Sequence, residues 1–258
     1  ASRRDSAGLS VLAIRPGRQG IMPGQPLGEQ ELPGYLAPAP RRWATAGQLW
    51  GLAVGVPSVV LGLLGVRGLL PLGAVAVAAA AASHGAWVLE MARGRRRPGL
   101  DWGLRFTLTA TAFLVPAAVL GLALAFDLLS GPRVALAYAV AVLGGWISLT
   151  IAGMMLKIVP FLVWYRAYSP RAGREPVPTL AQISSPRLEG AAYALLTVGV
   201  LLLVVTTWLG DADTIRGAGV VLALGALAFA AALGRVLGHL HVPVNGWPRA
   251  HLPGASTS

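Results

Sequence analysis

The chain has 258 residues, of which 55% are apolar and only 12% are charged. A soluble globular domain carries about 25% charged residues, and a disordered chain combines low hydrophobicity with high charge, so the composition excludes both classes. It predicts an all-α, polytopic transmembrane helical bundle. The net charge of +11 comes from arginines beside long apolar runs, not from a basic helix with interleaved aromatics, and we expect no nucleic-acid partner. Cysteine is absent, which excludes disulfides and catalytic thiols.

Residues 1–45 form a segment rich in proline and arginine, with no convincing helical period. We expect this segment to be cytoplasmic and largely unstructured. Its one apolar run, Val11–Ile14, is shorter than the roughly 7 to 15 apolar residues of a signal peptide. The chain begins with Ala1 rather than Met, and we interpret it as a fragment of a longer protein.

The region 46–240 is predicted to be a six-helix transmembrane domain, followed by a flexible cytoplasmic tail over 241–258. A bilayer core of about 30 Å needs roughly 20 apolar residues in helical form. The stretches that meet this requirement are Gly47–Val66, Leu69–Leu89, Phe106–Leu128, Val134–Leu156, Ala191–Leu209 and Gly217–Leu237. Strands are excluded because the runs are apolar on every face and longer than the alternating segments of a barrel.

Arginines predict the orientation of these spans. They are frequent before the first span, between the second and third, between the fourth and fifth, and after the sixth, whereas the opposite side holds only Arg67, Arg133 and Arg216. By the positive-inside rule both termini are cytoplasmic. We therefore expect a multi-pass protein of the cell's inner (plasma) membrane, with the lipid bilayer as its first partner.

Small residues at spacing four predict where the helices pack, because such residues let helix backbones approach closely. Three rows have this spacing: Ala74, Ala78, Ala82 and Ala86; Gly144, Ser148 and Ala152; and Ala226, Ala230, Gly234 and Gly238. We interpret all three rows as packing seams.

Lys157, the single lysine, follows the fourth span directly. That span is long enough to cross the membrane alone, which places Lys157 at the cytoplasmic interface, where its stem can snorkel. Pro160 is expected to break the helix, and the aromatics that follow, including Trp164, are typical of an interfacial belt. The alternative is that Lys157 faces a cytoplasmic cavity and binds an anionic group.

His84 lies about three-quarters of the way through the second span, three residues before Trp87. A histidine at this depth can ligate haem iron or relay protons, or it can hydrogen-bond to a neighbouring helix. His239 and His241 are expected at the interface, and His251 in the tail.

No catalytic signature is present, neither a nucleophile elbow, a zinc motif nor a phosphate-binding glycine loop. The carboxylates Glu90, Asp101, Glu175 and Glu189 flank arginines and are interpreted as surface ion pairs. Without a complete catalytic or metal-ligand constellation, the sequence favours a protein that is not an enzyme.

One stretch is more particular than the rest, GWISLTIAGMMLKIVPFLVW over 145–164, followed by YSPRAGREPVP over 168–178. It resembles bacterial membrane proteins of the haem–copper oxidase subunit I-like family, specifically the C-terminal half of those longer chains. The resemblance implies relatives of cytochrome oxidase and makes haem a candidate cofactor. The metal centres of that superfamily use six histidines, whereas this chain has 4, so the family ligands cannot be carried over.

Three functions remain open. The first is an oxidase-like membrane protein without oxidase activity on its own, the second a small-molecule transporter or channel, and the third a structural or assembly subunit that packs with other membrane subunits. Under the first, the candidate cofactor-binding residues are His84, Lys157, Trp146 and Trp164. His84 would be the ligand and Lys157 the partner of a haem propionate or quinone headgroup, with Trp146 and Trp164 packed around that group.

Overall fold

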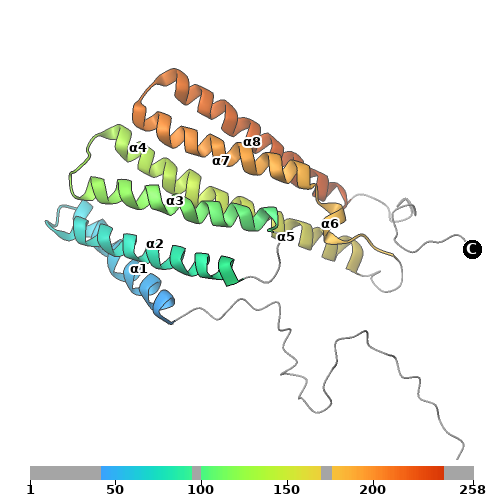
Figure 1. Cartoon of the computed structure of the whole chain (residues 1–258), viewed down its shortest axis with the longest axis horizontal. Coiled ribbons are helices and arrows are strands. Elements are labelled where there is room, and N and C mark those ends of the chain that lie inside the picture. The colour runs from blue at the N-terminus through green and yellow to red at the C-terminus, as the bar shows by residue number, and fades with distance from the viewer. Residues whose placement is uncertain (1–41, 95–99, 170–175, 241–258) are drawn as a thin grey trace, which may run out of the picture. The chain divides into compact units, whose positions relative to one another are not determined.

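The computed structural model describes residues 42–94, 100–169 and 176–240, and every element in these ranges is helical (Figure 1). The elements are α1 (Arg42–Leu63), α2 (Leu69–Gly94), α3 (Trp102–Ala125), α4 (Pro132–Val140), the π-helix η1 (Ala141–Ser148), α5 (Leu149–Tyr168), α6 (Leu180–Ile183), α7 (Pro186–Leu209) and α8 (Ala212–Gly238). Because α4, η1 and α5 are continuous, these ranges contain 6 helices long and apolar enough to cross a membrane. The predicted all-α fold with six spans is confirmed, and the chain is an integral, multi-pass membrane protein.

The helices pack as two hairpins on either side of a central pair. α1 packs on α2, α7 packs on α8, and α3 lies between them in contact with α2, α5 and α7 (Figure 1). Turns 64–68 and 126–131 and residues 210–211 form one end of the bundle, which we call the Arg-poor end. The opposite end, where α1 begins and α8 ends, is the Arg-rich end.

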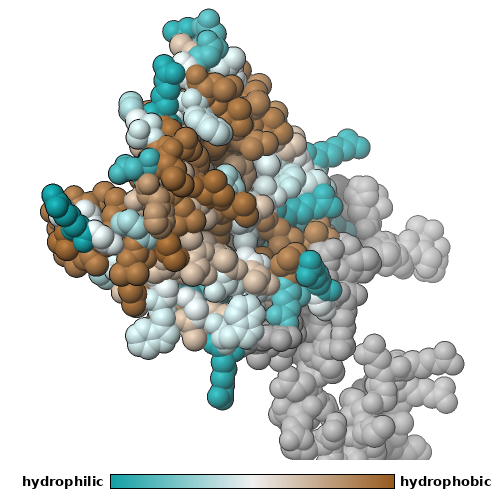
Figure 2. Space-filling view, turned by 60° about the vertical axis from the view of Figure 1, so that its left-hand side comes forward, coloured by the Kyte–Doolittle hydropathy of each residue, from teal (hydrophilic) through white to brown (hydrophobic). Residues whose placement is uncertain are grey.

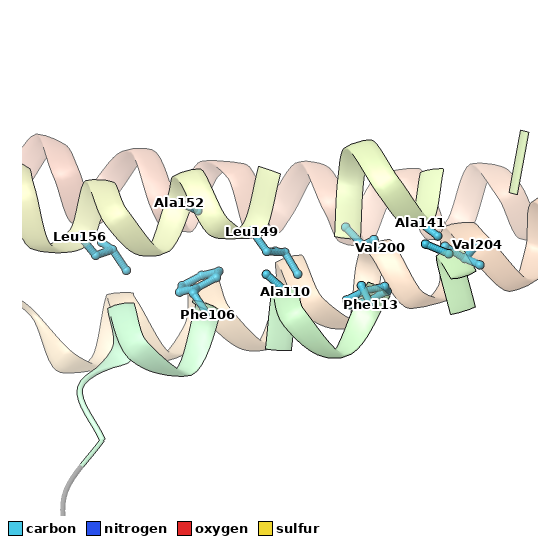
Figure 3. Packing of buried hydrophobic residues seen from close by; sticks show 10 residues of the cluster. Phe106, Ala110, Phe113, Ala141, Leu149, Ala152, Leu156, Val200 and Val204 are labelled. Atoms are coloured by element: carbon cyan, nitrogen blue, oxygen red, sulfur yellow. The ribbon is translucent and has the colours of Figure 1, made fainter. Parts of the chain in front are cut away.

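The core lies where α3 faces the continuous helix α4–η1–α5. Phe106 from α3 points toward Leu149 and Ala152 on α5, and Phe113, further along α3, lies beside Val200 of α7 (Figure 3). Large apolar side chains elsewhere are exposed over much of the bundle, and they dominate the face shown in Figure 2. Such a surface suits lipid, in which helix association depends on packing contacts rather than on hiding apolar area.

Glycine pairs set the closest helix crossings. A Cβ on Gly153 would lie 2.6 Å from the carbonyl oxygen of Gly103, and a Cβ on Gly103 would lie 2.7 Å from that of Gly153. These distances are too short for any side chain, so α3 and α5 cross here in backbone contact. Gly55 and Gly73 bring α1 and α2 together in the same way.

The packing rows predicted from spacing four are wrong for two helices. On α8, Gly234 and Gly238 have no neighbour that a Cβ would meet, and Ala226 and Ala230 are exposed. On α2, Ala82 and Ala86 are exposed, whereas Gly73 and Ala80 are buried. In the central helix Ala152 is buried but Ser148 is exposed. A row of small residues permits close approach on that face, but only the partner helix decides which face is used.

The expected helix break at Pro160 is also wrong. α5 continues through Pro160 to Tyr168, and Pro160 itself is buried. Proline removes one backbone hydrogen bond, and spanning helices tolerate that loss when neighbouring groups surround the gap. The whole span from Pro132 to Tyr168 has 37 residues, about 55 Å at roughly 1.5 Å per residue, and exceeds a bilayer core of about 30 Å.

The π-helix η1 interrupts this long span near its middle. Gly145 lies under Phe113, whose ring would overlap any Cβ placed there. The hydroxyl of Ser148 donates to the Leu143 carbonyl at 2.7 Å, five residues back. Such wider turns are rare and occur mostly as single-turn insertions within α-helices.

Candidate functional site

Lys157 lies on α5 at the Arg-rich end of the bundle. Its Nζ is 3.2 Å from Oδ2 of Asp101, while Oδ1 of Asp101 accepts the backbone N–H of Leu104 at 2.7 Å and caps α3. Both side chains are about half exposed, at 47% and 61%. An exposed pair of this kind contributes between zero and about 1 kcal/mol to stability. Lys157 therefore links the start of α3 to α5 beside the Gly103–Gly153 crossing.

A second carboxylate lies close to this ion pair. Glu189, in the first turn of α7, is buried, with a side-chain hydrogen bond to Ser184 and an electrostatic interaction with Asp101. Asp101 thus forms a surface ion pair, as interpreted from the sequence, although its partner is Lys157 rather than an arginine. The interpretation of Glu189 as a surface ion pair is wrong, because Glu189 is buried. The signal that could have identified Glu189 is its helical spacing from Tyr193, one turn further into the apolar span.

Tyr193 lies one turn after Glu189 on α7, deeper in the bundle. Its hydroxyl lies 2.8 Å from Oγ1 of Thr109 on α3, and its ring contacts Phe106 at 5.3 Å and Trp102 at 5.7 Å between centroids. Arg105 stacks on the Trp102 ring, with its guanidinium carbon 4.3 Å from the ring centre. These contacts join α3 to α7, and the sequence analysis had singled out none of them.

His84 lies on α2 and contacts a side chain of α1. Its Nδ1 is 3.3 Å from Oε1 of Gln48, and its ring meets that of Trp87 edge-on at 6.4 Å between centroids. An open pocket of about 660 Å³ lies alongside, lined by Gln48, Trp87 and neighbouring residues of α1. The geometry agrees with the interpretation of His84 as a residue hydrogen-bonded to a neighbouring helix.

The two tryptophans lie far apart on one helix. Trp164 donates its Nε1–H to the Pro178 carbonyl at 2.7 Å, whereas Trp146 lies in η1. Their separation along the helix is about 27 Å at roughly 1.5 Å per residue. They cannot pack around one small group held by Lys157, so the structure does not bring the four predicted site residues together.

Beyond Lys157, α5 reaches the end of α8. The Tyr168 hydroxyl lies 3.0 Å from Nδ1 of His239, and the two rings meet edge-on. Burial lowers the pKa of His239 below its usual value, and the nearby Arg235 lowers it further. His239 lies at the helix end, as predicted, but as the partner of a tyrosine.

Trp146 contributes to a large apolar cleft. The cleft has a volume of about 570 Å³ and lies between the α1–α2 hairpin and the helices α3, α4 and η1. Alanine, valine and leucine dominate its lining, with Tyr138 and Trp146 as its only side chains that carry polar atoms. Such a lining can hold an apolar molecule and offers no ligands for a metal ion.

The described residues contain no group of three or more His, Cys, Asp or Glu side chains that could hold a metal. No family model, no curated protein and no solved structure matches the chain. The class of protein that the fold defines is therefore a six-span helical membrane protein. The resemblance to haem–copper oxidase relatives has no support from these comparisons.

Proposed function

We propose that this chain is a membrane-embedded structural module that acts by packing with other membrane subunits and has no oxidase activity on its own. In this proposal it is similar to the C-terminal half of haem–copper oxidase subunit I-like proteins. The observation that carries the proposal is the position of residues 145–164, the stretch behind the resemblance, at the centre of the bundle. This stretch packs against α3, α7 and α8.

The distinctive residues of this stretch have structural partners. Gly145 lies under Phe113, Gly153 meets the backbone of α3, and Lys157 pairs with the cap of α3. Trp164 anchors the segment before α6 by donating a hydrogen bond to the carbonyl of Pro178. Packing requirements alone thus account for the residue pattern, and a shared helix arrangement would preserve it without any redox chemistry.

The positions of the histidines, the residues that would bind a haem, support the same proposal. A haem held by two axial histidines, or a haem–copper pair, needs several histidines facing one space. In the described ranges, His84 pairs with Gln48 near α1 and His239 with Tyr168 at the end of α8. These residues do not fit a haem–copper centre, and we derive no reaction step through such a group.

The test is an optical spectrum of the purified protein in detergent, dithionite-reduced minus oxidised, after expression with a haem precursor supplied. We expect no Soret band of stoichiometric intensity. A stoichiometric band that His84→Ala abolishes and His239→Ala retains would overturn the proposal and assign a haem to α2.

Two further measurements test the structural role itself. Light scattering of the protein extracted from its native membrane with a mild detergent, with the mass of bound detergent subtracted, should give a protein mass well above that of one 26.6 kDa chain. A single chain in this measurement would contradict the proposal. Solute-dependent flux in vesicles reconstituted with the purified chain would also contradict it, in favour of a transporter or channel.

A further inference from the structure

The apolar cleft beside Trp146 has the dimensions of one lipid leaflet. Along α3 its lining runs from Leu114 to Ala125, about 16 Å at roughly 1.5 Å per residue. Half of a bilayer core of about 30 Å is close to this length. Leu63 and Ala125 lie at the Arg-poor end, whereas Leu114 and Trp146 lie toward the middle of their spans. The cleft therefore extends from one membrane surface to near the mid-plane.

Small side chains keep this space open. α2 contributes Ala74, Ala78 and Ala81, and α3 contributes Ala117, Ala118 and Gly121. The Tyr138 ring lies across Gly121, where a Cβ would be 3.0 Å from Cε2 of the tyrosine. The volume of about 570 Å³ falls within the range of about 300 to 1,000 Å³ that is typical of small-molecule pockets.

Charges of both signs flank the mouth of the cleft. Arg67 is exposed in the turn between Leu63 and Leu70, both of which line the cleft. Asp127 is exposed in the adjacent turn, two residues after the end of α3. Turns at the ends of spanning helices lie at the depth of the lipid headgroups. A headgroup with one phosphate and one ammonium group matches this pair of charges.

We propose that the cleft binds one acyl chain of a zwitterionic phospholipid from the leaflet at the Arg-poor end. The phosphate of this lipid pairs with Arg67 and its ammonium group with Asp127, while the chain runs down the alanine-lined cleft toward Trp146. This proposal needs only the membrane-spanning fold and is independent of whether the chain is a structural module.

Native mass spectrometry tests the proposal on the full chain, purified in detergent with added palmitoyl-oleoyl phosphatidylethanolamine. We expect one retained lipid per chain. Ala78→Leu fills the cleft and should lower the retained fraction about tenfold, which corresponds to about 1.4 kcal/mol of lost binding. The matched control is Ala82→Leu, one turn further along α2 at an exposed residue outside the cleft lining, which should retain the lipid.

Three further measurements test the proposal independently of Ala78→Leu. If Ala78→Leu lowers the yield of folded protein, Ala118→Leu fills the cleft from α3 instead. Phosphatidylglycerol, which lacks the ammonium group, should be retained less than phosphatidylethanolamine. Arg67→Gln should weaken retention of both lipids. Equal retention by wild type, Ala78→Leu and Ala118→Leu would overturn the cleft as the binding site, and equal retention of the two lipids would overturn the zwitterionic preference.

Discussion

At the scale of single residues, the position of each glycine decides whether it can be replaced. Gly153 touches the backbone of α3, whereas Gly234 on α8 has no atom within reach of an added Cβ. Both glycines lie inside spanning helices. Replacing each glycine by alanine therefore separates two effects, the cost of overpacking and the gain in helix propensity.

We predict that Gly153→Ala destabilises the protein by about 1 to 3 kcal/mol through overpacking, because the methyl group would collide with the carbonyl of Gly103. Gly234→Ala should be neutral or stabilising, because alanine is the better helix former by up to about 1 kcal/mol. Thermal melting of both variants in the same detergent checks the difference. Equal melting temperatures would show that the α3–α5 crossing is looser than described.

The burial of His239, together with the nearby Arg235, predicts a dependence of stability on pH. The pKa of His239 is lowered in the folded protein, so the unfolded chain binds more protons at acidic pH. Stability should therefore be full above the unfolded pKa of about 6.5 and should decline as the pH falls through the lower folded pKa.

The measurement is the melting temperature between pH 8 and pH 5, values chosen to bracket the histidine pKa of about 6.5. We expect it to decrease on acidification, and His239→Gln should reduce that decrease because glutamine carries no titratable proton. Identical pH profiles for wild type and His239→Gln would show that another group controls the dependence.

At the scale of elements, the π-helix η1 explains how neighbouring residues of the central span contact both the core and the cleft. The wider turns place Gly145 under Phe113 while Trp146 lines the cleft. A π turn differs from an α turn by one additional residue. Removing one residue from η1 should therefore leave the helices on both sides in their original rotational positions.

We predict that deletion of Gly144, within η1, yields a folded protein in which Trp146 no longer faces the cleft. Deletion of Ile158, within the regular helix α5, should instead rotate the following residues by about 100° and destroy the contacts of Pro160 and Trp164. Folded yield by size-exclusion chromatography compares the two variants. A larger loss for the Gly144 deletion would contradict the description of η1 as a one-residue insertion.

At the scale of the whole molecule, the distribution of arginines and the even number of spans make one joint prediction. Arg42 at the start of α1 and Gly238 at the end of α8 lie at the same end of the bundle, and the arginine-rich connections predict that this end is cytoplasmic. Reporters fused after Gly238 and inserted at Gly131 should therefore read opposite sides, cytoplasmic and external respectively. A cytoplasmic signal at Gly131 would reverse the orientation.

The sequence alone determined that this protein crosses a membrane six times and where the core of each span lies, but not that the fourth helix continues beyond Leu156 to Tyr168. The reason is physical, because about 20 consecutive apolar residues must form a helix in a medium without water. It also placed His84 inside a span. Lys157, which the sequence placed directly after the fourth span, lies instead within a helix that continues to Tyr168.

Only the tertiary structure decided which groups meet. The pairs Lys157–Asp101, His84–Gln48 and Thr109–Tyr193 join different helices, and nothing along the chain encodes the rotation of one helix against another. The same limit explains why the seam on α8 was wrong, since small residues permit contact on a face without requiring it. The cleft beside Trp146 likewise exists only because the α1–α2 hairpin and the helices α3, α4 and η1 leave space between small side chains.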